Sequence, residues 1–188
     1  MKKIFNFFTL VNFKILKKNK ILIFGSQNLP EIKKIIKEKT DVLDLNKEIN
    51  FFILVEMLLN LKFKRSDYIF FFIKRVNPKL ILSSADNDIN VYNLKNYFTN
   101  IIIILIQNGR RGGLIDIFNR EFKKRLNKKK EIDYFFVFGE AIKKKYSQFV
   151  NSKYYFTGSI KNNFNKIIIK KEKYDDKILF ISQFRPNN

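Results

Sequence analysis

The sequence predicts a doubly wound α/β domain built on a mostly parallel sheet. Short apolar runs bounded by turn residues recur along the chain, and the longer segments between them repeat apolar residues every three or four positions. Strands that are apolar on both faces are typical of a parallel sheet covered by helices on both sides. With 188 residues, the chain is long enough for one hydrophobic core of this Rossmann-like type.

The first part of the chain is expected to form two strands and three helices. Residues 20–25 form an apolar strand that closes on a glycine turn, and Pro30 marks the start of the next helix. Ser66 or Asp67 can cap a later helix, which must end before Pro78. The expected order is strand 20–25, helix 29–39, strand 41–45, a buried helix over 51–62 and a helix over 66–77.

The second part is expected to continue the alternation. The lysine-rich tract 123–130 indicates a helix with a solvated face. The expected order is strand 79–85, helix 89–98, strand 100–107, helix 115–130, strand 133–139, helix 140–149, strand 153–158 and, after a lysine-rich connector, strand 177–183.

Three parts of the chain differ in character. Residues 1–19 form a basic amphipathic lead-in, residues 20–170 the main lobe, and residues 171–188 a linker and a strand. The lead-in can pack on the lobe, or it can lie on an anionic membrane surface. Because no apolar run approaches the ~18 residues of a membrane span, we expect a cytoplasmic protein, with peripheral contact at the inner face of the plasma membrane as the alternative.

The composition excludes several kinds of chemistry. There is no Cys and no His, so disulfides, thiolate metal sites and histidine bases are excluded, and we expect neither a metal nor a cofactor. The formal charge of +21 would suit nucleic acid. However, the lysines are scattered and arginine, which reads bases, is scarce, so nucleic acid is not the expected partner.

The turn after the strand 100–107 is the most distinctive junction. Gln107 and Asn108 can both donate and accept hydrogen bonds, and Gly109 permits a turn that a side chain would forbid. Arg110 and Arg111 offer guanidinium groups that can bind phosphate or carboxylate in a bidentate manner. The alternative is a plain strand-to-helix turn with exposed arginines.

Two further junctions carry candidate residues. Asp86 and Asp88 follow a strand, and with no His present such a carboxylate is a candidate general base or a ligand of a sugar hydroxyl. The alternative is that Asp86, Asn87 or Asp88 caps the next helix. Gly158 and Ser159 follow another strand and could bind an anion through backbone amides, although this pattern is not specific.

Four segments taken in order carry a family resemblance. "SSADND", "IIIILIQNGRR", "DYFFVFG" and "YYFTGSIKNN" resemble the N-terminal half of bacterial surface carbohydrate biosynthesis proteins. This group is similar to GT-B glycosyltransferases and, more distantly, to CDP-glycerol glycerophosphotransferases. The resemblance covers most of the chain from about Lys20, and the ordered set is more specific than any one segment.

The resemblance implies two Rossmann-like lobes that bind a glycan acceptor and a nucleotide-sugar donor. Asp86 would be the base and Arg110 would offset charge on the leaving diphosphate. The acceptor side would also include Asn87, Gln107, Asn108, Gly109 and Arg111, while Gly158, Ser159, Lys161 and Asn162 would lie near the crossing between the lobes. Because the chain stops soon after the strand 177–183, the second lobe and its donor pocket would be missing. The alternative is a non-catalytic module that binds an anionic glycan or lipid head group through a partner chain.

Overall fold

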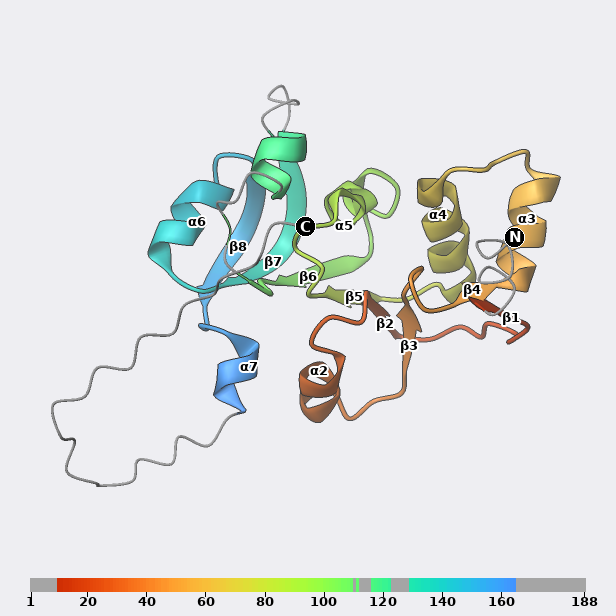
Figure 1. Cartoon of the computed structure of the whole chain (residues 1–188), viewed down its shortest axis with the longest axis horizontal. Helices are drawn as coiled ribbons and strands as arrows, with labels where there is room; N and C mark the ends of the chain where they lie inside the picture. The colour runs from red at the N-terminus through yellow and green to blue at the C-terminus, as the bar shows by residue number, and fades with distance from the viewer. Residues whose placement is uncertain (1–9, 110, 112–115, 123–128, 165–188) are drawn as a thin grey trace, which may run out of the picture.

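The computed structural model describes residues 10–109, 111, 116–122 and 129–164, and its centre is a parallel six-stranded sheet (Figure 1). The strands stand in the order β3-β2-β5-β6-β7-β8, and every neighbouring pair is parallel. This arrangement confirms the predicted fold class. The strands are β2 (Ile21–Phe24), β3 (Thr40–Leu43), β5 (Leu80–Ser83), β6 (Ile102–Ile106), β7 (Lys130–Val137) and β8 (Val150–Phe156).

Side chains alternate between two hydrophobic cores, one on each face of the sheet. Leu22, Ile103 and Phe135 are completely buried in the larger core, whereas Ile23 and Leu82 belong to the smaller core on the opposite face. Because strands with both faces buried must be apolar throughout, this explains the continuous apolar runs in the sequence.

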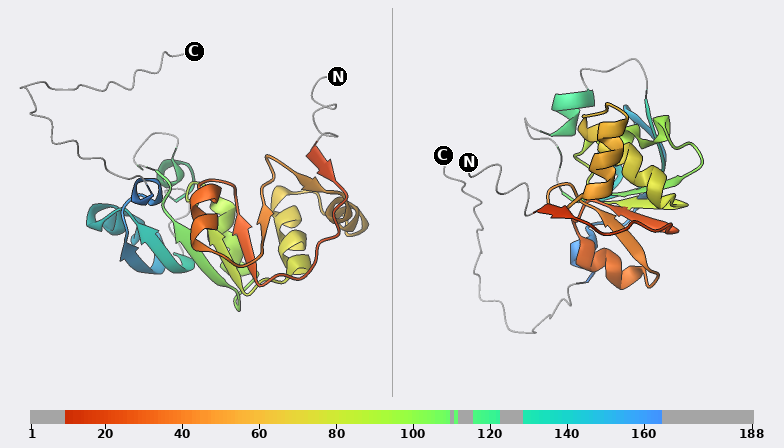
Figure 2. Two further views of the ribbon diagram at one scale, coloured as in Figure 1. Left: turned by 90° about the horizontal axis from the view of Figure 1, so that it is seen from below. Right: turned by 90° about the vertical axis from the view of Figure 1, so that its right-hand side faces the viewer.

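Helices cover both faces of the sheet unequally (Figure 2). The larger core is closed by α3 (Phe51–Leu59), α4 (Arg65–Val76), α5 (Ile89–Asn93), α6 (Glu140–Tyr146) and a π-helical turn, Phe118–Phe122. The smaller core is closed by α2 (Leu29–Ile35) and α7 (Ile160–Asn163). Between these two short helices, an apolar groove of about 410 Å³ remains.

A short strand pair that the sequence does not predict ties the lead-in to the lobe. β1 (Val11–Asn12) runs parallel to β4 (Ile49–Asn50). The Asn50 side chain is buried, and its amide donates to the Lys14 carbonyl oxygen at 2.6 Å and to Asn12 Oδ1 at 3.0 Å. Its Oδ1 accepts from the Ile53 N–H at 3.3 Å, so one asparagine both caps α3 and holds the lead-in.

The prediction of a solvated helix over 115–130 is wrong in the parts that the structure describes. Phe118 and Phe122 lie within a single π-helical turn and are buried, and Lys130 already belongs to β7. The Phe118 ring lies 4.7 Å from that of Tyr146, and the Phe122 ring lies 5.1 Å from that of Tyr92. Aromatic packing therefore turns Phe118 and Phe122 inward, although the lysine-rich tract 123–130 follows them in the sequence.

The prediction that 51–62 is a buried helix is also wrong. In α3 only Ile53 and Met57 are buried, whereas Leu58 and Leu59 are 60% and 79% exposed. The helix packs on α4 at the end of the molecule beyond β3, so nothing in the described structure covers its outer face (Figure 1).

Smaller differences concern element ends. The helix expected over 29–39 ends at Ile35, and the one expected over 89–98 divides into α5 and a 3₁₀ turn, Leu94–Asn96. α4 begins at Arg65, and the Asp67 carboxylate accepts from the Lys64 N–H at 2.9 Å. The strand expected over 177–183 and the third predicted part of the chain, 171–188, lie outside the described residues.

Candidate functional site

The carboxyl ends of β2 and β5 border a polar crevice. β3 and β5 lie on opposite sides of β2, so the connections that leave β2 and β5 diverge, and open parallel sheets bind ligands at such switch points. The crevice has a volume of about 250 Å³. Its polar lining consists of Gln27 after β2, Asp44 and Asn46 after β3, Arg65 from α4, Ser84, Asp86, Asn87 and Asp88 after β5, and Asn108 and Arg111 after β6.

The floor of the crevice depends on a glycine. Gly25 has a φ of +83°, which side chains with a Cβ rarely adopt. A Cβ at this position would also collide with the Gln27 side-chain oxygen and lie only 3.2 Å from the Cβ of Ala85. The positive φ and the close approach to the turn after β5 therefore both favour glycine at residue 25.

Two buried serines join these turns. Ser83 Oγ donates to the Phe24 carbonyl oxygen at 2.8 Å and accepts from the Ala85 N–H at 3.0 Å. Ser84 Oγ donates to the Gln27 carbonyl oxygen. Because both serines are buried, these bonds fix the backbone on both sides of the crevice.

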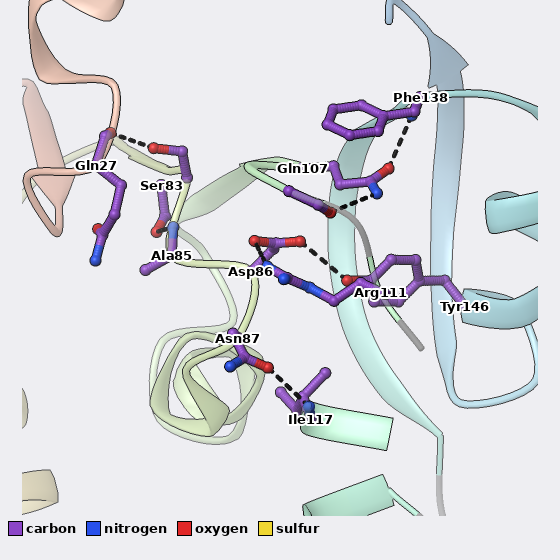
Figure 3. Close-up of polar contacts among 12 residues, drawn as sticks. Gln27, Ser83, Ala85, Asp86, Asn87, Gln107, Arg111, Ile117, Phe138 and Tyr146 are labelled. Carbon is purple, nitrogen blue, oxygen red and sulfur yellow. Dashed lines mark hydrogen bonds and ion pairs between the residues drawn. The ribbon is translucent and has the colours of Figure 1, made fainter. Parts of the chain in front are cut away.

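Asp86 lies at the inner end of the crevice as part of a buried polar cluster (Figure 3). Its Oδ1 forms an ion pair with the Arg111 guanidinium, and its Oδ2 accepts from the Tyr146 hydroxyl at 3.0 Å. The Tyr92 hydroxyl donates to the Asp86 carbonyl oxygen at 2.9 Å. The structure thus brings together Asp86 and Arg111, which the sequence proposed, with two tyrosines that it did not.

Burial shifts the titration of this cluster. Desolvation raises the pKa of Asp86, and the neighbouring Arg111 charge offsets part of that rise. Burial also raises the pKa of Tyr146 well above its usual value of 10.0. Tyr146 therefore stays protonated at neutral pH and can act as a donor to Asp86.

Both oxygens of the Asp86 carboxylate have a protein partner. The general-base role stays a prediction, and it would require Asp86 to give up one of its two bonds. Asp88 is the helix cap, since its Oδ1 accepts from the Asn90 N–H at 2.9 Å, and its Oδ2 lies 3.3 Å from Arg65. Of the three candidate caps, the structure selects Asp88.

The other predicted residues after β5 and β6 have different surroundings. Asn87 lines the crevice, and its Oδ1 accepts from the Ile117 N–H at 2.7 Å. Gln107 is buried outside the crevice lining, where its Nε2 donates to the Gly109 carbonyl oxygen at 2.9 Å and its Oε1 accepts from the Phe138 N–H at 2.8 Å. The hydrogen bonds of the Gln107 side chain therefore connect the turn after β6 to the residue that follows β7.

The conformational role expected for Gly109 is wrong. Among the described residues, a Cβ there would meet only the Arg111 Nη1 at 3.8 Å, an ordinary contact, and the φ of Gly109 is not in the left-handed region. Asn108 lines the crevice, and its buried Oδ1 has no hydrogen-bond donor among the described residues. Arg110 lies outside the described residues.

The predicted residues after β8 lie away from the crevice. Gly158 has a φ of +65°, and Ser159 precedes α7 without a side-chain capping bond. Lys161 and Asn162 are exposed on α7, which covers the smaller core. β6 and β7 separate β8 from β5, so the structure does not bring these four residues to Asp86.

Sequence reasoning proposed no residue after β3 and none from α4 for the crevice lining. Asp44 and Asn46 follow β3, and the rule that strand-end residues meet at one sheet edge could have found them. Arg65 comes from the start of α4, and no local sequence signal connects it to this edge. Among the described residues, no group of acidic side chains could hold a metal ion.

The parallel sheet, with a crevice at its switch point, has the architecture of the doubly wound α/β class. A family model described as "putative O-antigen biosynthesis protein" matches residues 104–188, which begin within β6. This match supports a role in surface polysaccharide biosynthesis. Searches among curated proteins and among solved structures gave no match. Within the described part of the chain, no helix is long and apolar enough to cross a membrane.

Proposed function

We propose that this chain is the acceptor-side lobe of a glycosyltransferase-like protein of surface polysaccharide biosynthesis. The observation that carries the proposal is the polar crevice at the switch point of the sheet, between the ends of β2 and β5. The family match over residues 104–188 supplies the biological setting, and it includes Asn108 and Arg111 of the crevice lining.

The size of the crevice favours a small ligand group. Its volume of about 250 Å³ lies just below the roughly 300–1,000 Å³ of pockets that enclose drug-sized molecules. A sugar ring suits this volume better than a whole nucleotide sugar does. The donor would therefore bind elsewhere, on a second lobe or a partner chain.

The lining suits hydroxyl groups because it mixes acceptors with donors. Asp44 Oδ1 accepts from the Asn46 N–H at 3.0 Å, while its Oδ2 has no hydrogen bond from the described residues. The exposed amide of Asn46 and the buried Oδ1 of Asn108 add one donor group and one acceptor at opposite walls. A sugar hydroxyl both donates and accepts, so it can satisfy such groups in pairs.

Two roles follow for the charged residues. Asp44 has the open carboxylate oxygen that a base needs to accept the proton of an acceptor hydroxyl, whereas Asp86 would hold Arg111 at the inner end of the crevice. Arg110, which the sequence suggests for this role and which lies outside the described residues, would offset charge on the leaving diphosphate.

A ligand-binding experiment with two matched asparagine variants tests the proposal. The melting temperature of the full chain is measured with oligosaccharides and, separately, with nucleotide sugars, since a ligand of the folded state raises it. We expect a rise with an oligosaccharide. Asn46→Ala should weaken that binding about fivefold, the worth of roughly one hydrogen bond. Asn162→Ala, an exposed amide on α7 away from the crevice, should leave it unchanged.

The opposite response of the two variants would show that the oligosaccharide binds at α7. If Asn162→Ala abolished the rise and Asn46→Ala did not, the crevice assignment would be wrong. If nucleotide sugars alone raised the melting temperature, this lobe would bind the donor instead of the acceptor.

A further inference from the structure

The outer face of α3 carries a continuous apolar stripe. Phe51, Phe52, Val55, Leu58 and Leu59 are all exposed, and their spacing places them along one side of the helix. The opposite side is the one that buries Ile53 and Met57. A surface helix of a globular protein normally has a polar outer face, so an apolar stripe of this length points to a contact that the described residues do not fill.

Neighbouring segments extend this stripe. The Phe13 ring, 67% exposed, lies 4.9 Å from the ring of Phe51, and therefore joins the lead-in to α3. After the helix, Leu61 and Phe63 are 77% and 69% exposed. We call the set formed by these three residues and the α3 stripe the α3 surface.

The charges around the α3 surface are predominantly positive. Lys62 and Lys64 alternate with Leu61 and Phe63, and both lysines are exposed. The acidic residues nearby already have partners. Arg75 lies 2.5 Å from Glu56, Asn12 donates to Glu48 at 3.1 Å, and Asp67 accepts from the Lys64 N–H.

We propose that the α3 surface docks on an anionic lipid bilayer, with its phenylalanine and leucine side chains among the lipid tails and its lysines among the phosphates. Apolar residues interleaved with lysines fit the boundary between headgroups and acyl chains. Protein interfaces instead exclude lysine from their centres. A two-fold contact would press this lysine-bearing surface against the same surface of a second copy, which the repulsion between like charges disfavours.

Vesicle flotation of the full-length chain tests this docking surface. We expect the chain to float with vesicles of equal parts phosphatidylglycerol and phosphatidylcholine, to bind phosphatidylcholine vesicles much more weakly, and to lose binding as salt rises. Leu59→Ser should weaken binding about tenfold, because a buried leucine side chain is withdrawn from the lipid. The matched control is Ile35→Ser, which replaces a 59% exposed side chain on α2 and should leave binding unchanged.

A second pair of variants tests the charges. Lys62→Gln/Lys64→Gln removes two exposed lysines beside α3, and binding should weaken about thirtyfold, since each lysine near an anionic surface contributes about fivefold. Lys37→Gln/Lys39→Gln removes two exposed lysines with the same spacing after α2 and should have a much smaller effect. Equal losses in both double variants would show that net charge, not the α3 surface, drives binding.

Two outcomes would overturn the proposal directly. One is that the wild-type chain fails to float with the anionic vesicles. The other is that Leu59→Ser converts a dimer to a monomer in sedimentation while vesicle binding stays unchanged, which would make the α3 surface a contact between two copies.

Discussion

Removing the charge of Asp86 should destabilise the protein more than any surface change of the same chemistry. The Asp86 and Arg111 side chains are only 1% and 11% exposed, so Asp86→Asn leaves a buried guanidinium without its counter-charge. Breaking a buried ion pair from one side costs about 3–5 kcal/mol. For a chain of this size each kcal/mol lowers Tm by about 2–4 °C, so we expect a decrease of about 6–20 °C.

Urea unfolding followed by circular dichroism measures this cost as a change in the free energy of unfolding. Asparagine is preferred to alanine because its side-chain oxygen can still accept from Tyr146. Arg111→Met should also be costly, because it leaves the Asp86 carboxylate buried alone. The double variant should cost clearly less than the sum of the two single variants, since neither charge is then left unpaired.

An exposed ion pair provides the control. Lys143 and Glu140 lie 3.6 Å apart on α6 with much of both side chains in solvent, so Glu140→Gln should change stability by less than about 1 kcal/mol. If Asp86→Asn were as mild as Glu140→Gln, and if the two single effects simply added in the double variant, the pair would contribute little to stability. Asp86 would then be free to serve as the base that the sequence suggests.

Three further predictions test the cluster, the turn after β2 and the orientation of α3. The raised pKa of Tyr146 means that above pH 10 the unfolded chain loses a proton that the folded protein keeps, so its stabilising effect, complete below pH 10, should fall by about 1.4 kcal/mol per pH unit. Burial also raises the pKa values of Tyr68, Tyr92 and Tyr154, so in urea titrations at rising pH Tyr146→Phe should lessen the slope by this one-proton share and leave the rest. Gly25→Ala should cost about 1–3 kcal/mol in thermal melts because of its positive φ, whereas Gly139→Ala, with nothing within 4 Å of the added Cβ, should be nearly neutral. Ile53→Ala should cost about 2–5 kcal/mol in urea and Leu59→Ala less than about 0.5 kcal/mol; equal costs would mean that α3 buries a different face.

Much of the fold could be predicted because the pattern of apolar residues records which strands have two buried faces. The run 101–106 is apolar without interruption, and β6 lies in the interior of the sheet, with β5 and β7 beside it. The pairing of β1 with β4 could not be predicted in this way. It depends on the buried Asn50 side chain, whose amide donates to acceptors more than thirty residues away in the sequence.

The apolar pattern also misled the interpretation of 51–62. Apolar residues all around a helix normally mean that the helix is buried. Here they create one buried face and one exposed face, and only the position of α3 beyond the sheet distinguishes the two cases. Composition cannot show which face of a helix has a partner.

The candidate site was predicted only in outline. The rule that ligands bind beyond the carboxyl ends of strands indicated the turn after β5, and that turn lines the crevice. It could not rank the residues within a turn, because Asp86 and Asp88 differ in their partners and not in their chemistry. Tyr146 entered the cluster from sixty residues away, so no spacing in the sequence could have revealed it.

The crevice and the α3 surface adjoin, but variants that alter one surface at a time can separate their roles. Phe63 belongs to the α3 surface and Arg65 lines the crevice, so at most about 7 Å of extended chain joins them. If both proposals hold, docking would bring the crevice close to the lipid headgroups. Leu59→Ser should then reduce vesicle binding while a soluble oligosaccharide still binds, and Asn46→Ala should do the reverse. A variant of either kind that abolished both activities would indicate a loss of folding, or one shared site where we infer two.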